Sequence, residues 1–162
     1  MPFNLRRSAG RTSAGKTFGK PAGLADDDLP PIMYLRIMEE NDISYIIRGC
    51  IFKVYNNLGP GLLESAYEAA LGLELMNAGL QVKMQAALPM IYQSVKVDVG
   101  YRLDVVVEDK VIIEIKSVEN LIDVHHKQVI TYLKLSGMRL GLLVNFNSGD
   151  IAKSIFRKVN KL

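Results

Sequence analysis

The sequence predicts a single α/β domain, and three observations lead to this prediction. Helical apolar spacing covers residues 41–57 and 61–78, short β-prone runs occupy residues 81–116, and a helix followed by a strand returns over residues 122–146. No internal repeat or second core divides the 162 residues. A chain of this length can bury about two thirds of its unfolded surface, so one core is sufficient. The expected element order is α-α-β-β-β-α-β.

Residues 1–32 differ from the rest of the chain in composition. They are rich in Gly, Ser, Arg and Pro and have no apolar period, which is typical of a disordered tail. They contain five Lys or Arg and three Asp, so the remaining chain has a net charge of only +1. We therefore expect a tail over residues 1–32, a folded domain over residues 33–162, and a basic surface only if charges gather locally.

Composition excludes several classes of protein. The lone Cys50 lies in an apolar helical pattern, which indicates a buried thiol in a reducing compartment and excludes a cysteine-based zinc site. No apolar run reaches the roughly 18 residues that a membrane span needs, and the N-terminus lacks the apolar stretch of a secretory signal. The expectation is a soluble, cytoplasmic protein that does not bind membranes.

The two N-terminal helices are predicted from apolar stripes and stop signals. Asn41 or Asp42 can cap the first helix. Its apolar stripe consists of Ile43, Ile46, Ile47, Cys50, Ile51 and Val54. The segment NLGPG then breaks the chain, and the second helix begins near Gly61 or Leu62 and ends where Gly79 supplies a favourable stop.

The second helix places acidic side chains on two different faces. In helical projection Glu64 lies beside Tyr67 and Leu71, on the apolar stripe, and is predicted to face inward. Glu68 lies toward the polar flank and is predicted to be solvated. An aromatic residue at this spacing is more often part of the core than a substrate contact, and this applies to Tyr67.

The C-terminal third returns to helical spacing before its last strand. Residues 122–136 form the predicted helix, Gly137 ends it, and RLGLLVNF reads as a buried strand. On this helix Gln128 and Tyr132 fall on one stripe with His125, for which a hydrogen-bonded position at the edge of the core is expected. The final segment KSIFRKVN is compatible with either a strand or a helix.

The strands over residues 101–116 carry charges among buried apolar residues. Side chains alternate across a strand, so Ile112, Glu114 and Lys116 are predicted to share one face. Charged groups in a sheet interior cost several kcal/mol unless they are paired or bind a metal. Asp104, Glu114 and Lys116 therefore need a compensating partner.

The length of the loop between the two strands decides whether the carboxylates meet. If Glu108–Lys110 form a three-residue loop, Asp104 falls directly opposite Glu114. Such a loop favours Gly or Asn at its left-handed position, which would be Lys110 here, so a longer odd loop or a bulge is the alternative. A loop of two or four residues would place an isoleucine opposite Asp104 instead. The odd register is the one that brings the charges together.

Opposed carboxylates destabilise a sheet unless a cation lies between them. Oxygen ligands on rigid strands suit a hard divalent ion, so the expected cofactor is Mg²⁺ or Mn²⁺ with several waters retained. The alternative is that Asp104 and Glu114 lie at solvated strand ends and that Lys116 simply pairs with Glu114.

An ordered set of motifs over about residues 40–160 resembles the small bacterial GxxExxY protein family, which is assigned to the PD-(D/E)XK nuclease superfamily. The motif that names the family is present as GLLESAY, with Gly61, Glu64 and Tyr67. The nuclease motif is present as Asp104 followed by EIK at 114–116.

Two later segments extend the resemblance. QVITY supplies the Gln128 and Tyr132 of a Q-x-x-x-Y helix, and GLLVNF at 141–146 resembles the closing strand. The proline of the superfamily's name is replaced by Leu103, a departure that is common in the superfamily.

The resemblance implies a restriction-endonuclease-like core, with a central mixed β-sheet flanked by helices. It also implies a metal-dependent nuclease that hydrolyses phosphodiester bonds in DNA or RNA. Asp104 and Glu114 would hold the ion, with the carbonyl of Ile115 as a further ligand, and Lys116 would orient or help deprotonate the attacking water.

Two further residues complete the expected site. Glu64 would bind the metal or its water from the helix side, and Gln128 would orient a ligand or contact the substrate, with Tyr132 as packing support. The alternative function is a catalytically inactive module on the same fold that binds nucleic acid or protein, and a third is a structural adaptor.

Nucleic acid is the expected partner, and the near-neutral charge of the domain makes a homodimer or a protein partner a further expectation. The expected phosphate contacts are Lys83, Lys96, Arg102, Lys127 and Arg139.

Overall fold

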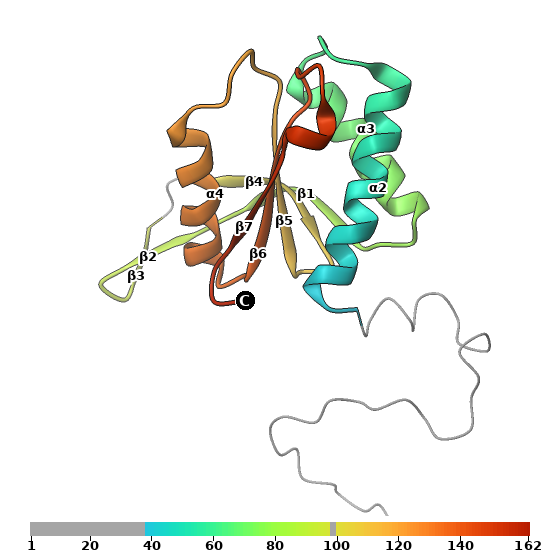
Figure 1. Ribbon diagram of the computed structural model, residues 1–162. Helices are drawn as coiled ribbons and strands as arrows, with labels where there is room; N and C mark the ends of the chain where they lie inside the picture. The colour runs from blue at the N-terminus through green and yellow to red at the C-terminus, as the bar shows by residue number, and fades with distance from the viewer. Residues whose placement is uncertain (1–37, 98–99) are drawn as a thin grey trace, which may run out of the picture.

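A five-stranded mixed sheet separates two helical layers in the computed structural model, which describes residues 38–97 and 100–162 (Figure 1). The strands of this sheet, in spatial order, are β1 (Val82–Ala87), β4 (Arg102–Val107), β5 (Val111–Lys116), β6 (Leu140–Asn145) and β7 (Ile155–Val159). β5 and β6 are parallel, and the other neighbours are antiparallel. The predicted tail over residues 1–32 lies outside the described residues.

The helices cover both faces of the sheet. α2 (Glu40–Leu58) and α3 (Glu64–Asn77) lie on one face, and α4 (Asp123–Ser136) lies on the other, where it connects the parallel strands β5 and β6 (Figure 1). This arrangement confirms the predicted fold class. No helix in the described ranges is long and apolar enough to cross a membrane.

The elements outside the predicted order are short. β2 (Met90–Tyr92) and β3 (Val95–Val97) form a separate two-stranded ribbon between β1 and β4. Its turn residues Gln93 and Ser94 both have positive φ, as a two-residue hairpin loop requires. The ambiguous C-terminal segment contains the short 3-10 helix η2 (Ile151–Lys153) and then β7, which pairs with β6.

The first helix starts earlier than predicted. Glu39, rather than Asn41 or Asp42, is the capping residue, and its backbone N–H donates to Oδ2 of Asp42 at 3.2 Å. The predicted stripe is confirmed: Cys50 is buried with its neighbours, and Ile46 is half-buried at the edge of the same cluster.

The second helix starts later than predicted, at Glu64. The hydroxyl of Tyr67 donates to the carbonyl of Gly59 at 2.7 Å and accepts from the backbone N–H of Leu62 at 3.1 Å. These bonds hold the preceding segment outside the helix, with Gly61 at a φ of 102°. The predicted end at Gly79 is confirmed, because Gly79 has a φ of 84° and donates to Met76, the geometry of a glycine stop.

The side chains of β5 alternate between the two faces of the sheet, as predicted, because its residues divide between the two hydrophobic cores. Ile113 and Ile115 belong to the core beneath α2 and α3, whereas Ile112 belongs to the core beneath α4. Because side chains two apart share a face, Glu114 and Lys116 also point to the α4 side. The sheet thus presents these charges on the face that α4 covers.

α4 lies directly on the backbone of β6. A Cβ added at Gly141 would be 2.7 Å from Cγ1 of Val129 and 3.5 Å from Cδ1 of Leu133. The missing side chain therefore permits the close approach of helix and sheet that places Gln128 beside β5.

We expect Gly141→Ala to lower the free energy of unfolding by about 1–3 kcal/mol, because the added methyl group overpacks this contact. Gly149→Ala is the matched control, since a Cβ there meets no atom within 4 Å. Urea unfolding of the two variants measures the difference. Equal stabilities would contradict the packing described here.

Candidate active site

The register of the β4–β5 hairpin is the odd one. Val107 pairs with Val111 and Val105 pairs with Ile113, so the loop has three residues, as required for Asp104 to fall opposite Glu114. The predicted left-handed position at Lys110 is wrong. Glu108 and Asp109 have φ values of 53° and 54°, because the N–H of Lys110 donates to the carbonyl of Val107 and closes a tight turn around them.

Asp104 lies where the alternation of its strand reverses. Leu103 belongs to the core on the α4 side, yet Val105 belongs to the core on the α2 and α3 side, although residues two apart normally share a face. The facing residue on β1, Gln85, has a left-handed φ of 48°. Such a conformation in a non-glycine residue costs about 1–2 kcal/mol. Both strands are therefore distorted at the same level.

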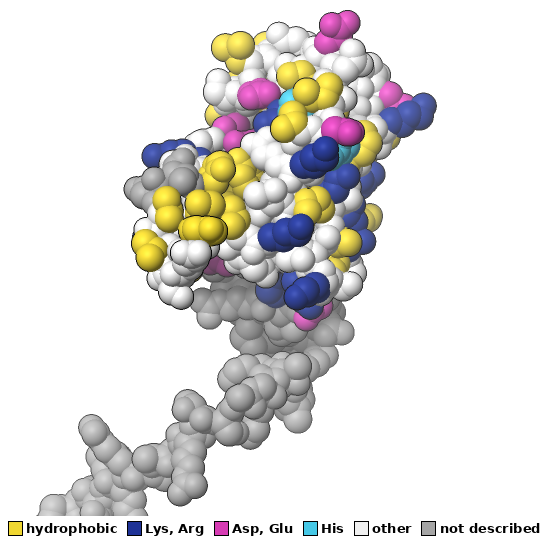
Figure 2. All heavy atoms as spheres, turned by 90° about the vertical axis from the view of Figure 1, so that its left-hand side faces the viewer, with side chains coloured by type: hydrophobic (Ala, Val, Ile, Leu, Met, Phe, Trp, Pro, Cys, Tyr) yellow, Lys and Arg dark blue, Asp and Glu magenta, His cyan; other side chains and the backbone are white. Residues whose placement is uncertain are grey.

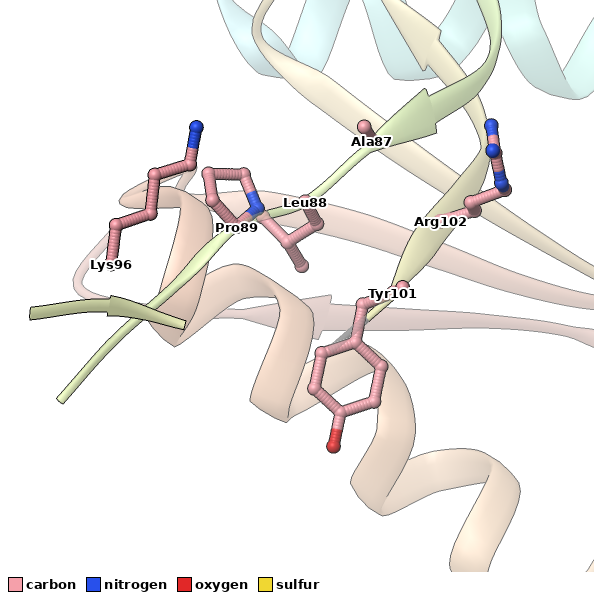
Figure 3. A pocket seen from close by; sticks show the side chains of 7 residues that line it. Ala87, Leu88, Pro89, Lys96, Tyr101 and Arg102 are labelled. Carbon is pink, nitrogen blue, oxygen red and sulfur yellow. The ribbon is translucent and has the colours of Figure 1, made fainter. Parts of the chain in front are cut away.

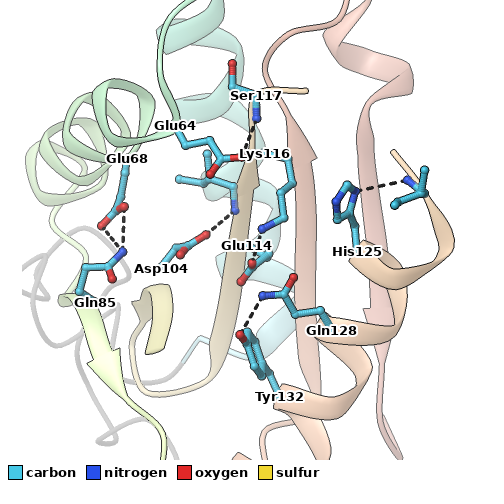
Figure 4. A network of polar contacts seen from close by, with 12 residues as sticks. Glu64, Glu68, Gln85, Asp104, Glu114, Lys116, Ser117, His125, Gln128 and Tyr132 are labelled. Atoms are coloured by element: carbon cyan, nitrogen blue, oxygen red, sulfur yellow. Dashed lines mark hydrogen bonds and ion pairs between the residues drawn. The ribbon is translucent and has the colours of Figure 1, made fainter. Parts of the chain in front are cut away.

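The carboxylate of Asp104 bonds to the neighbouring strand. Its Oδ2 accepts from the backbone N–H of Ile115 at 2.8 Å (Figure 4). The N–H and C=O of one strand residue point to the same side of the strand, so the carbonyl of Ile115 is directed toward the Asp104 edge. Burial raises the pKa of Asp104, although this hydrogen bond and Lys116 oppose the shift.

Glu114 is a buried carboxylate with one oxygen unsatisfied. The residue is 1% exposed, and its Oε1 lies 2.7 Å from Nζ of Lys116. Its Oε2 has no hydrogen-bond partner among the residues that the structure describes. Burial, and then the nearby charge of Asp104, raise the pKa of Glu114 to about 7, against the effect of Lys116.

Lys116 is the cation of this group. Burial by itself would lower its pKa, but the hydrogen bond to Glu114 and the charges of Glu114, Asp104 and Glu64 outweigh it, and the pKa is raised. The side chain is therefore held as an ammonium group. The structure thus brings Asp104, Glu114 and Lys116 together, as predicted from the sequence (Figure 4).

Glu64 lies at the rim of the site. It is exposed, which differs from the predicted inward orientation, because it is the first residue of α3 and stands beyond the packed part of the stripe. Its Oε1 accepts from the backbone N–H of Ser117 at 3.1 Å (Figure 4). The hydroxyl of Ser117 donates to the carbonyl of Leu62 at 2.6 Å. Ser117 thus joins the end of β5 to the start of α3.

Tyr67 is a core residue that also organises this rim. Its side chain is fully buried and its ring stacks on Phe146, with centroids 4.5 Å apart and an interplanar angle of 6°. Its hydroxyl holds the loop that contains Leu62. Gly61, Glu64 and Tyr67 therefore form one structural unit in which the tyrosine fixes the loop and the glutamate reaches Ser117.

Glu68 and Gln85 approach the site although the sequence did not single them out for it. Nε2 of Gln85 lies 2.9 Å from both carboxylate oxygens of Glu68. Glu68 is half-buried rather than solvated, and burial, together with the charges of Asp104 and Glu64, raises its pKa. The sequence could not predict this position, because Gln85 faces the site only through its left-handed backbone conformation, and no hydrophobic period predicts such a conformation.

α4 contributes an amide and a phenol on the other side of the site. Nε2 of Gln128 donates to the hydroxyl of Tyr132 at 2.8 Å (Figure 4). Tyr132 is buried, which confirms its packing role, and burial raises its pKa, with a further contribution from Glu114. His125 is half-buried and its Nδ1 accepts from the N–H of Ile122 at the start of α4.

The donor set fits a partly hydrated divalent ion rather than a closed protein cage. Within the described ranges no three or more His, Cys, Asp or Glu side chains are grouped closely enough to hold a metal. Asp104, Glu114 and the carbonyl of Ile115 supply two carboxylates and one further oxygen. Mg²⁺ is commonly held by one or two carboxylates with several waters, and the unsatisfied, buried Oε2 of Glu114 is an oxygen that such an ion would satisfy.

A shallow pocket lies along β4 beyond Asp104. Its lining includes Lys96, Tyr101 and Arg102, and its volume is about 200 Å³ (Figure 3). The guanidinium of Arg102 donates to the carbonyl of Gln85 at 3.3 Å. Tyr101 packs edge-on against Tyr132, with ring centroids 6.1 Å apart. Two residues that line the pocket therefore contact residues of the site: Arg102 contacts Gln85 on β1, and Tyr101 contacts Tyr132 on α4.

Comparison with known proteins gives a family for the chain. The model of the PD-(D/E)XK nuclease superfamily matches residues 41–159, which include all the site residues described above. The chain therefore belongs to the PD-(D/E)XK nuclease superfamily. Searches of curated proteins and of solved structures each gave no match.

In the metal-free protein, Glu114→Gln should gain stability relative to wild type as the pH rises from 5 to 8. Folding raises the pKa of Glu114 from 4.5 to about 7, so the folded state binds more protons than the unfolded state in this window. The wild-type free energy of unfolding therefore falls as the pH rises, and the variant lacks this contribution.

Urea unfolding in EDTA at both pH values measures the effect, with Glu119→Gln, an exposed position outside the site, as the matched control. A difference between Glu114→Gln and wild type that does not change with pH would contradict the described burial.

Proposed function

We propose that this protein is a metal-dependent nuclease that hydrolyses phosphodiester bonds in DNA or RNA. The observation that carries the proposal is the convergence of Asp104, Glu114 and Lys116 at one point of the sheet. Membership of the PD-(D/E)XK nuclease superfamily supports it. The retained pattern of two acids and one lysine matches the chemistry that gives this superfamily its name.

The site has too much negative charge for its single lysine. Asp104, Glu114 and Glu64 all act on Lys116, and Glu114 keeps a buried oxygen without a partner in the described chain. A carboxylate that is buried and unpaired is costly. Binding of Mg²⁺ or Mn²⁺ by Asp104, Glu114 and the carbonyl of Ile115 removes this cost, and this is the cofactor that we propose.

A bound divalent ion supplies Lewis-acid stabilisation of the phosphate charge and a lowered pKa for a bound water. The side chains of the chain contribute positioning and charge. Because Lys116 is held as an ammonium group, its role is to orient the attacking water and to offset negative charge that develops on the phosphate. A neutral general base at this position would need a lowered pKa, and the neighbouring carboxylates have the opposite effect.

Glu64 and Gln128 flank this centre from the two helical layers. Glu64 is fastened to Ser117, so it is placed to hold a water at the rim on the α3 side. Gln128 shares a hydrogen bond with Tyr132, which leaves the carbonyl oxygen of its amide to orient a water or a substrate group. Both roles are part of the proposal.

The narrower assignment to the GxxExxY family is also proposed. Its support is that Gly61, Glu64 and Tyr67 act as one unit around Ser117, so that the spacing of the motif has a structural purpose at the rim of the site. Nucleic acid is the proposed partner. The pocket of Lys96, Tyr101 and Arg102, at the start of β4, offers it two cations and an aromatic ring. The expected homodimer or protein partner stays a prediction.

Purified protein should cleave labelled DNA or RNA in Mg²⁺ or Mn²⁺ and not in EDTA, and Lys116→Ala should lower the rate by about 10²–10³-fold, the range for losing one group that stabilises charge in the transition state. Lys53→Ala is the matched control, because Lys53 pairs with Glu74 away from the site. Single-stranded, duplex and branched substrates are compared in one assay. Binding without cleavage of any of them would contradict the nuclease and favour an inactive binding module.

Divalent metal should raise the melting temperature of the wild type and leave that of Glu114→Gln almost unchanged. At a metal concentration a hundredfold above Kd, linkage gives about 2.7 kcal/mol, which corresponds to about 5–10 °C for a domain of this size. Glu119→Gln is the matched control and should respond as the wild type does. If the metal raises the melting temperature of Glu114→Gln as much as that of the wild type, the metal does not bind at Glu114.

A further inference from the structure

Positive charge gathers on the face of α4 that points away from the sheet. Figure 2 views the molecule from this side and shows several Lys and Arg side chains on the right of the view, whereas the largest cluster of hydrophobic side chains lies at the left. A groove of about 390 Å³ lies in this region. It is lined by His126, Lys127, Ile130, Thr131, Lys134 and Lys158.

The groove is built by one helix and one strand. Lys127, Thr131 and Lys134 are spaced four and then three residues apart on α4, so they form one stripe. Lys158 comes from β7, the edge strand of the sheet. The ring of His126 packs edge-on against Phe156 of β7, with centroids 5.0 Å apart, and this contact holds the two elements side by side.

The lysines of the groove have no acidic partner in the part of the chain that the structure describes. Over residues 38–97 and 100–162, the ammonium groups of Lys127, Lys134 and Lys158 form no ion pair or hydrogen bond. In contrast, two of the residues expected from the sequence to contact phosphate are already occupied: Lys83 pairs with Asp109 and Arg139 pairs with Glu40. Of the five expected contacts, Lys127 is the one that lies in this groove.

Lys158 also acts on the neighbouring imidazole of His126. Burial, and then the charges of Lys158 and His125, lower the pKa of His126, against the effect of Asp123. A surface usually intersperses charges of both signs. Three ammonium groups that have no ion-pair partner among the described residues repel one another around this groove, and a polyanion that binds there would relieve this repulsion.

The groove and the catalytic group lie on different sides of the same helix. Gln128 and Tyr132 occupy the side of α4 next to Glu114, whereas Lys127 and Lys134 occupy its outer surface. A helix with its side chains is about 10–12 Å across. Phosphates follow one another at about 3.4 Å along a strand of DNA. A nucleic acid bound at the catalytic group is therefore long enough to reach the groove within a few nucleotides.

We infer that the groove between α4 and β7 is a second binding site for the phosphate backbone of the nucleic acid, away from the bond that is cut. This inference rests on the proposed function, because it assigns the substrate as a polynucleotide that extends across α4. Lysine contacts to phosphate carry no sequence information, so the groove contributes affinity and position rather than base specificity.

The test compares two triple variants with the same change in net charge. The first is Lys127→Gln, Lys134→Gln and Lys158→Gln. The matched control is Lys53→Gln, Lys110→Gln and Lys153→Gln, because Lys53 and Lys153 are already paired with acids and Lys110 already donates to the carbonyl of Met38. Binding of a labelled duplex of about 20 base pairs, roughly two helical turns, and of the matching single strands of DNA and RNA is measured by fluorescence anisotropy in EDTA at several salt concentrations.

The groove variant should bind at least one of these nucleic acids about 10-fold to 100-fold more weakly at low salt. Its slope of log affinity against log salt should be smaller by about two to three, one for each phosphate that a lysine no longer neutralises. The control should bind as the wild type does. Equal binding by the two triple variants, or an unchanged salt slope, would overturn the inference.

A second readout separates this inference from the proposed function. Hydrolysis of bis(p-nitrophenyl) phosphate, a small phosphodiester that cannot reach across α4, should be unchanged in the groove variant and lowered in Lys116→Ala to the same extent as cleavage of nucleic acid. The wild type could hydrolyse no substrate while the groove variant still binds nucleic acid more weakly. This result would contradict the proposed nuclease activity and would support phosphate binding in the groove. If hydrolysis of the small diester falls in the groove variant to the same extent as binding, the groove is not separate from the site and the inference fails.

Discussion

The hydrogen bond from the backbone N–H of Ile115 to the carboxylate of Asp104 is the contact on which the arrangement of the site depends. In a regular antiparallel pair this N–H would bond to a carbonyl of β4. A side chain takes that place here, where the alternation of β4 reverses and Gln85 adopts a left-handed backbone. The carboxylate is thereby held between the strands, within the electrostatic reach of Glu114, instead of projecting into either helical layer.

The rim of the site depends on contacts between segments that are far apart in sequence. Ser117, at the end of β5, bonds to Glu64 and to the carbonyl of Leu62. Tyr67 holds the same loop from inside the core, stacked on Phe146. The motif at the start of α3 is therefore a brace between a helix and a strand, and its tyrosine serves the site without reaching it.

Charge is distributed unevenly over the molecule. At the catalytic group, carboxylates outnumber the single Lys116, and burial makes Glu114 costly to ionise. On the outer surface of α4 and on β7 the imbalance has the opposite sign. A cation would compensate the first region and a polyanion the second, so the two imbalances together match a metal-dependent enzyme that acts on nucleic acid. α4 separates them and contributes to both, with Gln128 on one side and Lys127 on the other.

Sequence patterns alone determined the fold class, the helices to within a few residues, the burial of Cys50, and the odd register of the β4–β5 hairpin, because hydrophobic period and loop parity are local properties of the chain. They misplaced the starts of α2 and α3, because side-chain bonds rather than propensity set those ends. Only the tertiary structure decided that Glu64 is exposed and that Gln85 and Glu68 approach the site. Two examples show the physical reason. The left-handed backbone of Gln85 within β1, and the position of Lys158 of β7 beside α4, both depend on packing between segments that are distant in sequence. Such packing leaves no period in the sequence.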